Sequence, residues 1–226
     1  MQESLYIIGD VHGCFHTLCS LIEKLPQKWD SQIIFTGDLI DRGQKSCEII
    51  DLIIKHNFKS VLGNHEELML KYYHAIPSDG CEKNWISNGG YETIESYQKN
   101  GGLKKIHDHL EWILSLPRYL EISIADDLGQ NLFITHGFGI PYYKERDKKA
   151  ESITWSRIKN HNIKKESQKK YGIFNVFGHD VQTTPMITDN FAAIDTGCVY
   201  HKRYKTASLT ALQWPSKKLF SQSYCG

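Results

Sequence analysis

Six potential metal ligands in this sequence share one position, because each closely follows a short apolar segment that is expected to form a strand. They are three oxygen donors and three histidines: Asp10, Asp38, Asn64, His12, His136 and His179. The carboxyl ends of neighbouring strands lie at one edge of a sheet, so we expect these side chains to lie close together. Mixed oxygen and imidazole donors suit Mn²⁺, Fe or Zn²⁺ better than Ca²⁺, which prefers oxygen ligands alone.

The number of these ligands predicts two metal ions rather than one. Six ligands exceed what one catalytic ion with open positions needs, and they suit two ions roughly 3.5–4 Å apart that share a carboxylate. Two cations lower the pKa of a bridging water, so that hydroxide is available near neutral pH to attack phosphorus. Planar arginine side chains match phosphate oxygens, and a histidine supplies the proton of the leaving group. The residue types therefore favour direct hydrolysis of a phosphate ester, without a phosphoenzyme.

The apolar pattern around these residues predicts three successive strand–loop–helix units at the start of the chain. Strands are expected at 5–8, 33–35 and 58–62, and helices at about 16–25, 46–56 and 66–74. Such units join parallel strands by right-handed crossovers, which places the three loops at one edge of the sheet. Further strands are expected at 119–124, 132–135, 175–177, 191–194 and 207–214. The pattern predicts an α/β protein with a largely parallel half-sheet and a β-rich second half.

Two segments interrupt this order. Residues 75–118 are expected to form a helical excursion over the rim of the site, because the segment is too short for a core of its own. Residues 144–170 carry ten lysines and arginines against four acidic residues. This basic segment is either a solvated loop or a cationic rim that attracts an anionic substrate.

Three stretches resemble the phosphoesterase motifs of the phosphoprotein phosphatase family, most closely in its small bacterial and phage serine/threonine members. They are Gly9–Gly13, Gly37–Gly43 and Gly63–Glu66. The later motifs are similar to His136-Gly137, Gly178-His179 and Asp195-Thr196-Gly197, and the match spans nearly the whole chain in the expected order. The resemblance implies a calcineurin-like metallophosphoesterase fold, a two-sheet β-sandwich flanked by helices (α/β/β/α), as a single domain over residues 1–226.

The resemblance also implies a role for each matching residue. Six would bind two divalent ions, Mn²⁺ by preference or else Fe or Zn²⁺: Asp10 and His12 the first ion, Asp38 both, and Asn64, His136 and His179 the second. His65 would be the general acid that protonates the leaving oxygen, oriented by Asp41. Arg42 would bind the phosphate, with Arg157, which follows a tryptophan as in the family, and Asn88 would lie at the rim.

The implied activity is removal of phosphate from phosphoserine and phosphothreonine in a phosphoprotein or phosphopeptide. The main alternative is a symmetrical diadenosine tetraphosphate hydrolase, because the same metals can act on a nucleotide anhydride and the basic segment would accept nucleotide phosphates. Glu66, Glu67 and Asp41 favour the phosphoprotein branch. A non-catalytic metal-binding scaffold is a second alternative, which the complete ligand set disfavours. Residues 180–185 and 198–205 depart from the family pattern near the expected substrate entrance and leave the leaving group open.

The composition excludes several other classes of protein. With 226 residues, 40% hydrophobic and 23% charged, the chain resembles an ordinary globular protein. A formal net charge of +1 favours neither a membrane surface nor a stable nucleic-acid partner. No apolar run reaches membrane-spanning length, and the six cysteines form no closely spaced pair. Because no leader segment is evident either, we expect a cytoplasmic protein with reduced thiols.

Overall fold

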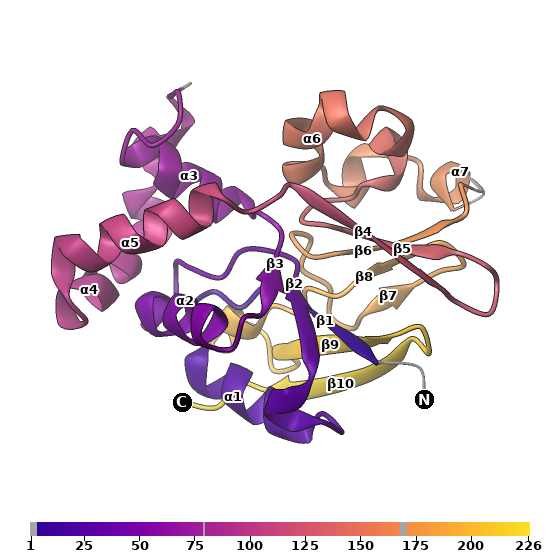
Figure 1. Ribbon diagram of the computed structural model, residues 1–226, viewed down its shortest axis with the longest axis horizontal. Helices are drawn as coiled ribbons and strands as arrows, with labels where there is room; N and C mark the ends of the chain where they lie inside the picture. Colours follow the sequence, from indigo (N-terminus) through magenta and orange to yellow (C-terminus); the bar gives the residue numbers. More distant parts are fainter. Residues whose placement is uncertain (1–3, 79, 168–170) are drawn as a thin grey trace.

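Two five-stranded sheets form the middle of the molecule, with strand orders β10-β9-β1-β2-β3 and β4-β5-β6-β8-β7 (Figure 1). The computed structural model describes residues 4–78, 80–167 and 171–226. The first sheet contains β1 (Leu5–Ile8), β2 (Gln32–Phe35), β3 (Lys59–Ser60), β9 (Ser208–Trp214) and β10 (Lys218–Ser223). The second contains β4 (Tyr119–Ala125), β5 (Asn131–Thr135), β6 (Ile173–Phe177), β7 (Met186–Ile187) and β8 (Phe191–Ala193).

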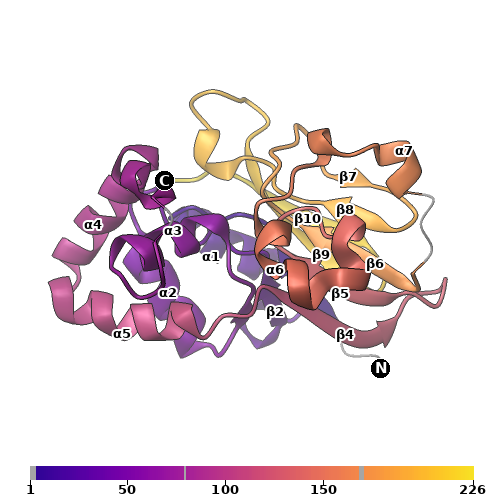
Figure 2. The same ribbon diagram turned by 90° about the horizontal axis from the view of Figure 1, so that it is seen from above.

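Helices cover the outer face of each sheet (Figure 2). On the side of the first sheet lie α1 (Phe15–Lys24), α2 (Ser46–Lys55), α3 (Asn64–Tyr72), α4 (Gly90–Lys99) and α5 (Gly102–Leu114). On the other side lie α6 (Arg146–Thr154) and α7 (Ile163–Glu166). Short 3-10 helices occur at Lys28–Asp30, Cys81–Asn84, Ile86–Asn88, Ile140–Glu145, Ile158–Asn160 and Cys198–Tyr200. Among the described residues, no helix has the length and apolar character to cross a membrane.

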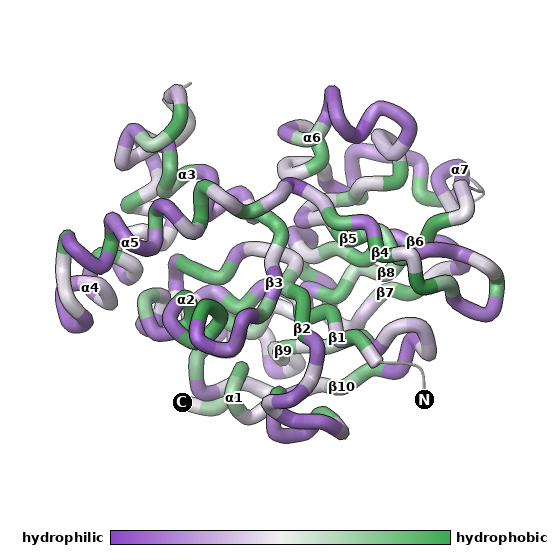
Figure 3. The backbone as a smooth tube through the Cα atoms, viewed as in Figure 1, coloured by the Kyte–Doolittle hydropathy of each residue, from purple (hydrophilic) through white to green (hydrophobic). Residues whose placement is uncertain are grey.

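The alternation of side chains along the strands explains this layering. In β1, Leu5 and Ile7 belong to the core between the two sheets, whereas Tyr6 and Ile8 belong to the core beneath the helices α1 and α2. A third core lies between the second sheet and α6. Strands buried on both faces carry continuous apolar runs, which is why β1 and β2 are so hydrophobic (Figure 3).

The parallel pairs in both sheets bring the strand ends together. Strands β1, β2 and β3 are parallel, as are β5, β6 and β8, while β9 pairs antiparallel with β1. The predicted two-sheet sandwich flanked by helices is therefore confirmed, and so is the parallel half-sheet. Strands β7 and β10 lack a sequence prediction. Strand β7 has only two residues, and the edge position of β10 leaves most of its residues partly or fully exposed.

Two local predictions differ from the structure. Strand β3 has two residues instead of the five expected at 58–62, because Leu62 already turns its N–H to the Pro117 carbonyl. The basic segment contains α6 and α7 rather than only loop; its Lys169 and Lys170 lie outside the described residues. The segment 75–118 is helical and adds Tyr97 and Ile106 to the core beneath the first sheet.

Candidate metal centre

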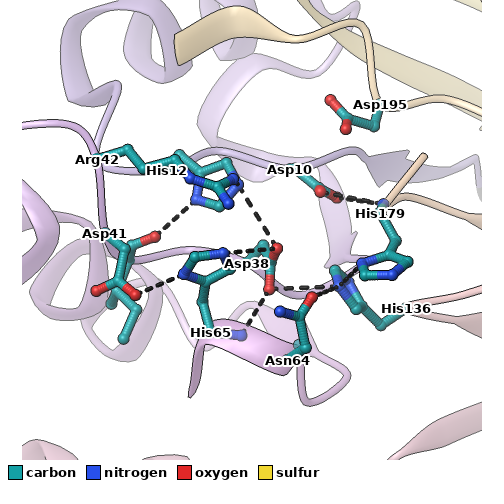
Figure 4. A network of polar contacts seen from close by, with 12 residues as sticks. Asp10, His12, Asp38, Asp41, Arg42, Asn64, His65, His136, His179 and Asp195 are labelled. Carbon is teal, nitrogen blue, oxygen red and sulfur yellow. Dashed lines mark hydrogen bonds and ion pairs between the residues drawn. The ribbon is translucent and has the colours of Figure 1, made fainter. Parts of the chain in front are cut away.

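The six predicted ligands occupy turns that directly follow strands or begin a helix (Figure 4). Three of them have a positive φ angle: His12 at 44°, Asp38 at 50° and His179 at 63°. Non-glycine residues in this left-handed region cost about 1–3 kcal/mol each and cluster at functional sites. The strained residues lie where the strand ends meet. Their backbone conformation directs the three side chains into one shared space.

Asp38 lies between two groups of candidate metal ligands, one containing His12 and the other containing His136 and His179 (Figure 4). Its Oδ2 is 3.5 Å from Nε2 of His12, and its Oδ1 is 3.3 Å from Nε2 of His136. The same His136 nitrogen is 2.9 Å from Oδ1 of Asn64 and 3.1 Å from Nδ1 of His179. Asp38 is 2% exposed and belongs to both groups of candidate ligands.

Asp10 is linked to the other candidate ligands by a hydrogen bond from the backbone N–H of His179. Its carboxylate accepts the N–H of His179 at 3.0 Å and the hydroxyl of Thr36 at 3.3 Å. Burial and the neighbouring carboxylates of Asp195 and Asp38 raise the pKa of Asp10 well above its usual value. A cation among these carboxylates would relieve that repulsion.

The tautomers of two histidines show why the cluster fits metal ions. Nδ1 of His12 is 2.8 Å from the Ile40 carbonyl, and Nδ1 of His136 is 2.8 Å from the Thr36 carbonyl. A carbonyl oxygen only accepts, so each Nδ1 carries the proton and each Nε2 presents a lone pair. Both lone pairs face the Asp38 carboxylate, which is also an acceptor. Arg42 donates to Nε2 of His12 at 2.6 Å, and around His136 the carboxylate, amide and imidazole acceptors converge as the ligands of a divalent metal do.

The protonation state of the histidines agrees with this role. Burial lowers the pKa of His12 and His136, and burial together with His136 and Arg157 lowers that of His179 to about 2. Neutral imidazoles are the form that binds metals. Burial would raise the pKa of Asp38, but the neighbouring histidines, among which His65 has a raised pKa, outweigh it and the pKa is lowered.

His65 and Asp41 form a buried pair beside Asp38 (Figure 4). Nδ1 of His65 lies 2.6 Å from Oδ2 of Asp41, and Nε2 lies 4.0 Å from Oδ2 of Asp38. Burial alone would lower the pKa of His65, but the carboxylates of Asp38 and Asp41 outweigh it and the pKa is raised. This imidazole therefore holds a proton more readily than the other histidines of the centre. Its distance to His12 and Asp38 would also allow it to bind a metal.

The predicted phosphate-binding residues lie on opposite sides of the centre. Nη1 of Arg42 is 2.6 Å from Nε2 of His12, and its Nη2 is 3.5 Å from Oδ1 of Asn88. Nη1 of Arg157 is 3.2 Å from the His179 carbonyl and 3.3 Å from Oδ1 of Asp180. One guanidinium is thus next to each of the two donor groups.

Glu66 is a site residue whose role the sequence did not predict. Its carboxylate accepts four backbone N–H groups, from Asp38, Leu39, Ile40 and Gly63, at 2.8–3.2 Å. Burial and Asp38 raise its pKa to about 7, whereas its backbone donors favour the charged form. Glu66 therefore fixes the loop of Asp38 to the start of α3. Its place in the Gly-Asn-His-Glu stretch was the available signal.

We expect Glu66→Gln to weaken metal binding by about 10–100-fold, because the amide repels at least one of the N–H groups that orient Asp38. Titration calorimetry with Mn²⁺ measures the affinity. The matched control is Glu67→Gln, since Glu67 is equally buried but binds Lys71 and Arg118 instead of the metal loop. An equal loss in both variants would show that Glu66 acts only through general stability.

Residues 4–208 match the family model for calcineurin-like phosphoesterases, so the chain belongs to that family. Serine/threonine-protein phosphatase 2 of Salmonella typhimurium is 36% identical over 162 residues, which cover 70% of this chain and 69% of that protein. The asymmetrical bis(5'-nucleosyl)-tetraphosphatase PrpE of Anoxybacillus flavithermus is 26% identical over 238 residues, covering 95% and 92%. The crystal structure of a putative diadenosine tetraphosphatase has the same fold, with a TM-score of 0.72, 20% identity and coverage of 100% and 96%.

Proposed function

We propose that this protein is a metal-dependent phosphomonoester hydrolase that removes phosphate from phosphoserine and phosphothreonine in proteins. The observation that carries the proposal is the buried His65–Asp41 pair, 2.6 Å apart, beside a carboxylate shared by two donor groups. A leaving serine or threonine alkoxide needs a proton, and this pair offers one.

The proposed location is a reducing cytoplasm. The described cysteines Cys14, Cys19, Cys47, Cys198 and Cys225 are free thiols, which fits that location.

In this proposal, Asp10, His12, Asp38, Asn64, His136 and His179 would hold two divalent ions, Mn²⁺ by preference, with Asp38 as the ligand common to both donor groups. When bound, the ions would supply a nucleophilic water and positive charge for the phosphate. Arg42 and Arg157 hold the phosphate oxygens from the two sides, and Asn88 supports Arg42. His65 donates its proton to the leaving oxygen while Asp41 keeps the ring in place.

A dinucleotide polyphosphate is the second candidate substrate. The PrpE relative, which is named for that activity, aligns along almost the whole chain. A cavity of about 340 Å³ also opens beside Arg42 and is lined by Lys45, His201, Lys202 and Tyr224. These cationic and aromatic side chains suit additional phosphates and a base.

One rate comparison tests both candidates. We expect Mn²⁺-dependent hydrolysis of a phosphoserine peptide to exceed that of diadenosine tetraphosphate at matched concentration, with chelation by EDTA abolishing both. A preference for the dinucleotide would replace the proposed substrate and keep the metal centre. Two bound metals without turnover of either substrate would favour a binding scaffold and contradict the proposal.

A further inference from the structure

We propose that Trp85 and Thr93 are positioning residues that hold Asp41 in the orientation that His65 requires. Both belong to the helical segment 75–118, which would therefore complete the active site rather than only cover its rim. The inference rests on the proposed function, since it takes His65 as the general acid.

The carboxylate of Asp41 is held at both oxygens. Its Oδ2 accepts the indole N–H of Trp85 at 2.8 Å and the Nδ1–H of His65 at 2.6 Å. Its Oδ1 accepts the hydroxyl of Thr93 at 2.7 Å. Asp41, Trp85 and Thr93 are each 0% exposed, so water does not replace a missing donor without rearrangement. A buried carboxylate depends on such donors, and here they also fix its rotation.

Thr93 contacts the same residue a second time. Its Oγ1 accepts the backbone N–H of Asp41 at 2.9 Å while its proton goes to the carboxylate. Asp41 has a φ of 73° and Arg42 a φ of 68°, so the turn is strained. The N–H of Arg42 donates to the Gly89 carbonyl at 3.0 Å. Residues of the helical segment thus hold both halves of the turn that carries the acid's partner and the phosphate-binding arginine.

Packing keeps Trp85 in place. A Cβ atom at Gly90 would lie 2.6 Å from the indole ring, so glycine is required where α4 begins. The rings of Tyr72 and Tyr73, at the end of α3, lie with their centroids 4.8 Å and 6.0 Å from that of Trp85. Helix α3 begins with Asn64 and His65. The indole therefore has one available position, and its N–H points at Asp41.

The test removes each donor with little change of shape. We expect Trp85→Phe and Thr93→Val to lower kcat on a phosphoserine peptide by roughly 10–100-fold at unchanged KM, as supporting hydrogen bonds do at metal sites. With p-nitrophenyl phosphate the loss should be several-fold smaller, because nitrophenolate departs without a proton. Thr93→Ser keeps the hydroxyl and should restore most of the rate.

Two controls separate positioning from general damage to the segment. Tyr97→Phe removes a buried hydroxyl from the same helix, one bonded to His109 rather than Asp41, and should leave both rates unchanged. In an Asp41→Asn background, Trp85→Phe should add little further loss, because its effect passes through Asp41. Equal losses on both substrates, or full additivity with Asp41→Asn, would overturn the inference. An inactive wild-type protein with bound metals would instead contradict the proposed function.

Discussion

Replacement of Asp38 by asparagine is expected to lower metal-dependent turnover at least about 1,000-fold, the equivalent of roughly 4 kcal/mol in activation free energy. Asp38 is the only described ligand placed in both donor groups, so one substitution affects both ions. The amide also replaces one carboxylate oxygen by an NH₂ group, which would face the lone pair of either His12 or His136. We therefore expect bound metal, counted by elemental analysis after dialysis, to fall along with the rate.

The same substitution removes a negative charge that, together with burial, raises the pKa of Asp10 and Asp195. The pKa of both carboxyl groups should therefore fall in the metal-free variant. The matched control is Asp51→Asn, a carboxylate on α2 that binds Lys105 far from the centre and should keep its metals and rate. Retention of both metals by Asp38→Asn would show that this carboxylate does not bridge them.

The grouping of the candidate metal ligands could be predicted from the sequence because these residues follow a local rule. A polar residue directly after an apolar strand is visible in the sequence, and parallel strands bring such residues to one edge. The structure gathers all six predicted ligands there, together with His65 and Asp41. The sheets followed from the same apolar pattern, apart from the short strands β3 and β7 and the exposed edge strand β10.

The supporting residues could not be predicted in this way. Trp85 and Thr93 lie 44 and 52 positions from Asp41 in the sequence, and nothing in their local pattern indicates that contact. Each would be read from the sequence as an ordinary buried or helical residue. Their roles depend on how the helical segment packs against the loop after β2, which is a tertiary property. Polar site residues at the ends of strands are thus easier to predict from the sequence than the residues that orient their side chains.

Replacement of His65 by asparagine is expected to separate the chemistry of the leaving group from metal binding. Loss of a general acid costs about 100–10,000-fold, and we expect a reduction in this range with a phosphoserine peptide. With p-nitrophenyl phosphate the loss should stay below about 10-fold, because that leaving group needs no protonation. Initial rates on both substrates, with the metal content of each sample, provide the measurement.

The metal content decides between the two roles that the geometry allows for His65. Its Nε2 is 4.0 Å from Asp38 and close to His12, so a metal-binding role would also lower the rate. A ligand role predicts loss of a metal and equal losses on both substrates, whereas an acid role predicts full metal content and unequal losses. His109→Asn, which removes a buried histidine bonded to Tyr97 and Asp51, should change neither quantity. The contact of Nδ1 with Asp41 favours the acid role. The negative charge of the Asp41 carboxylate stabilises the protonated imidazole, so that His65 holds its second proton more firmly.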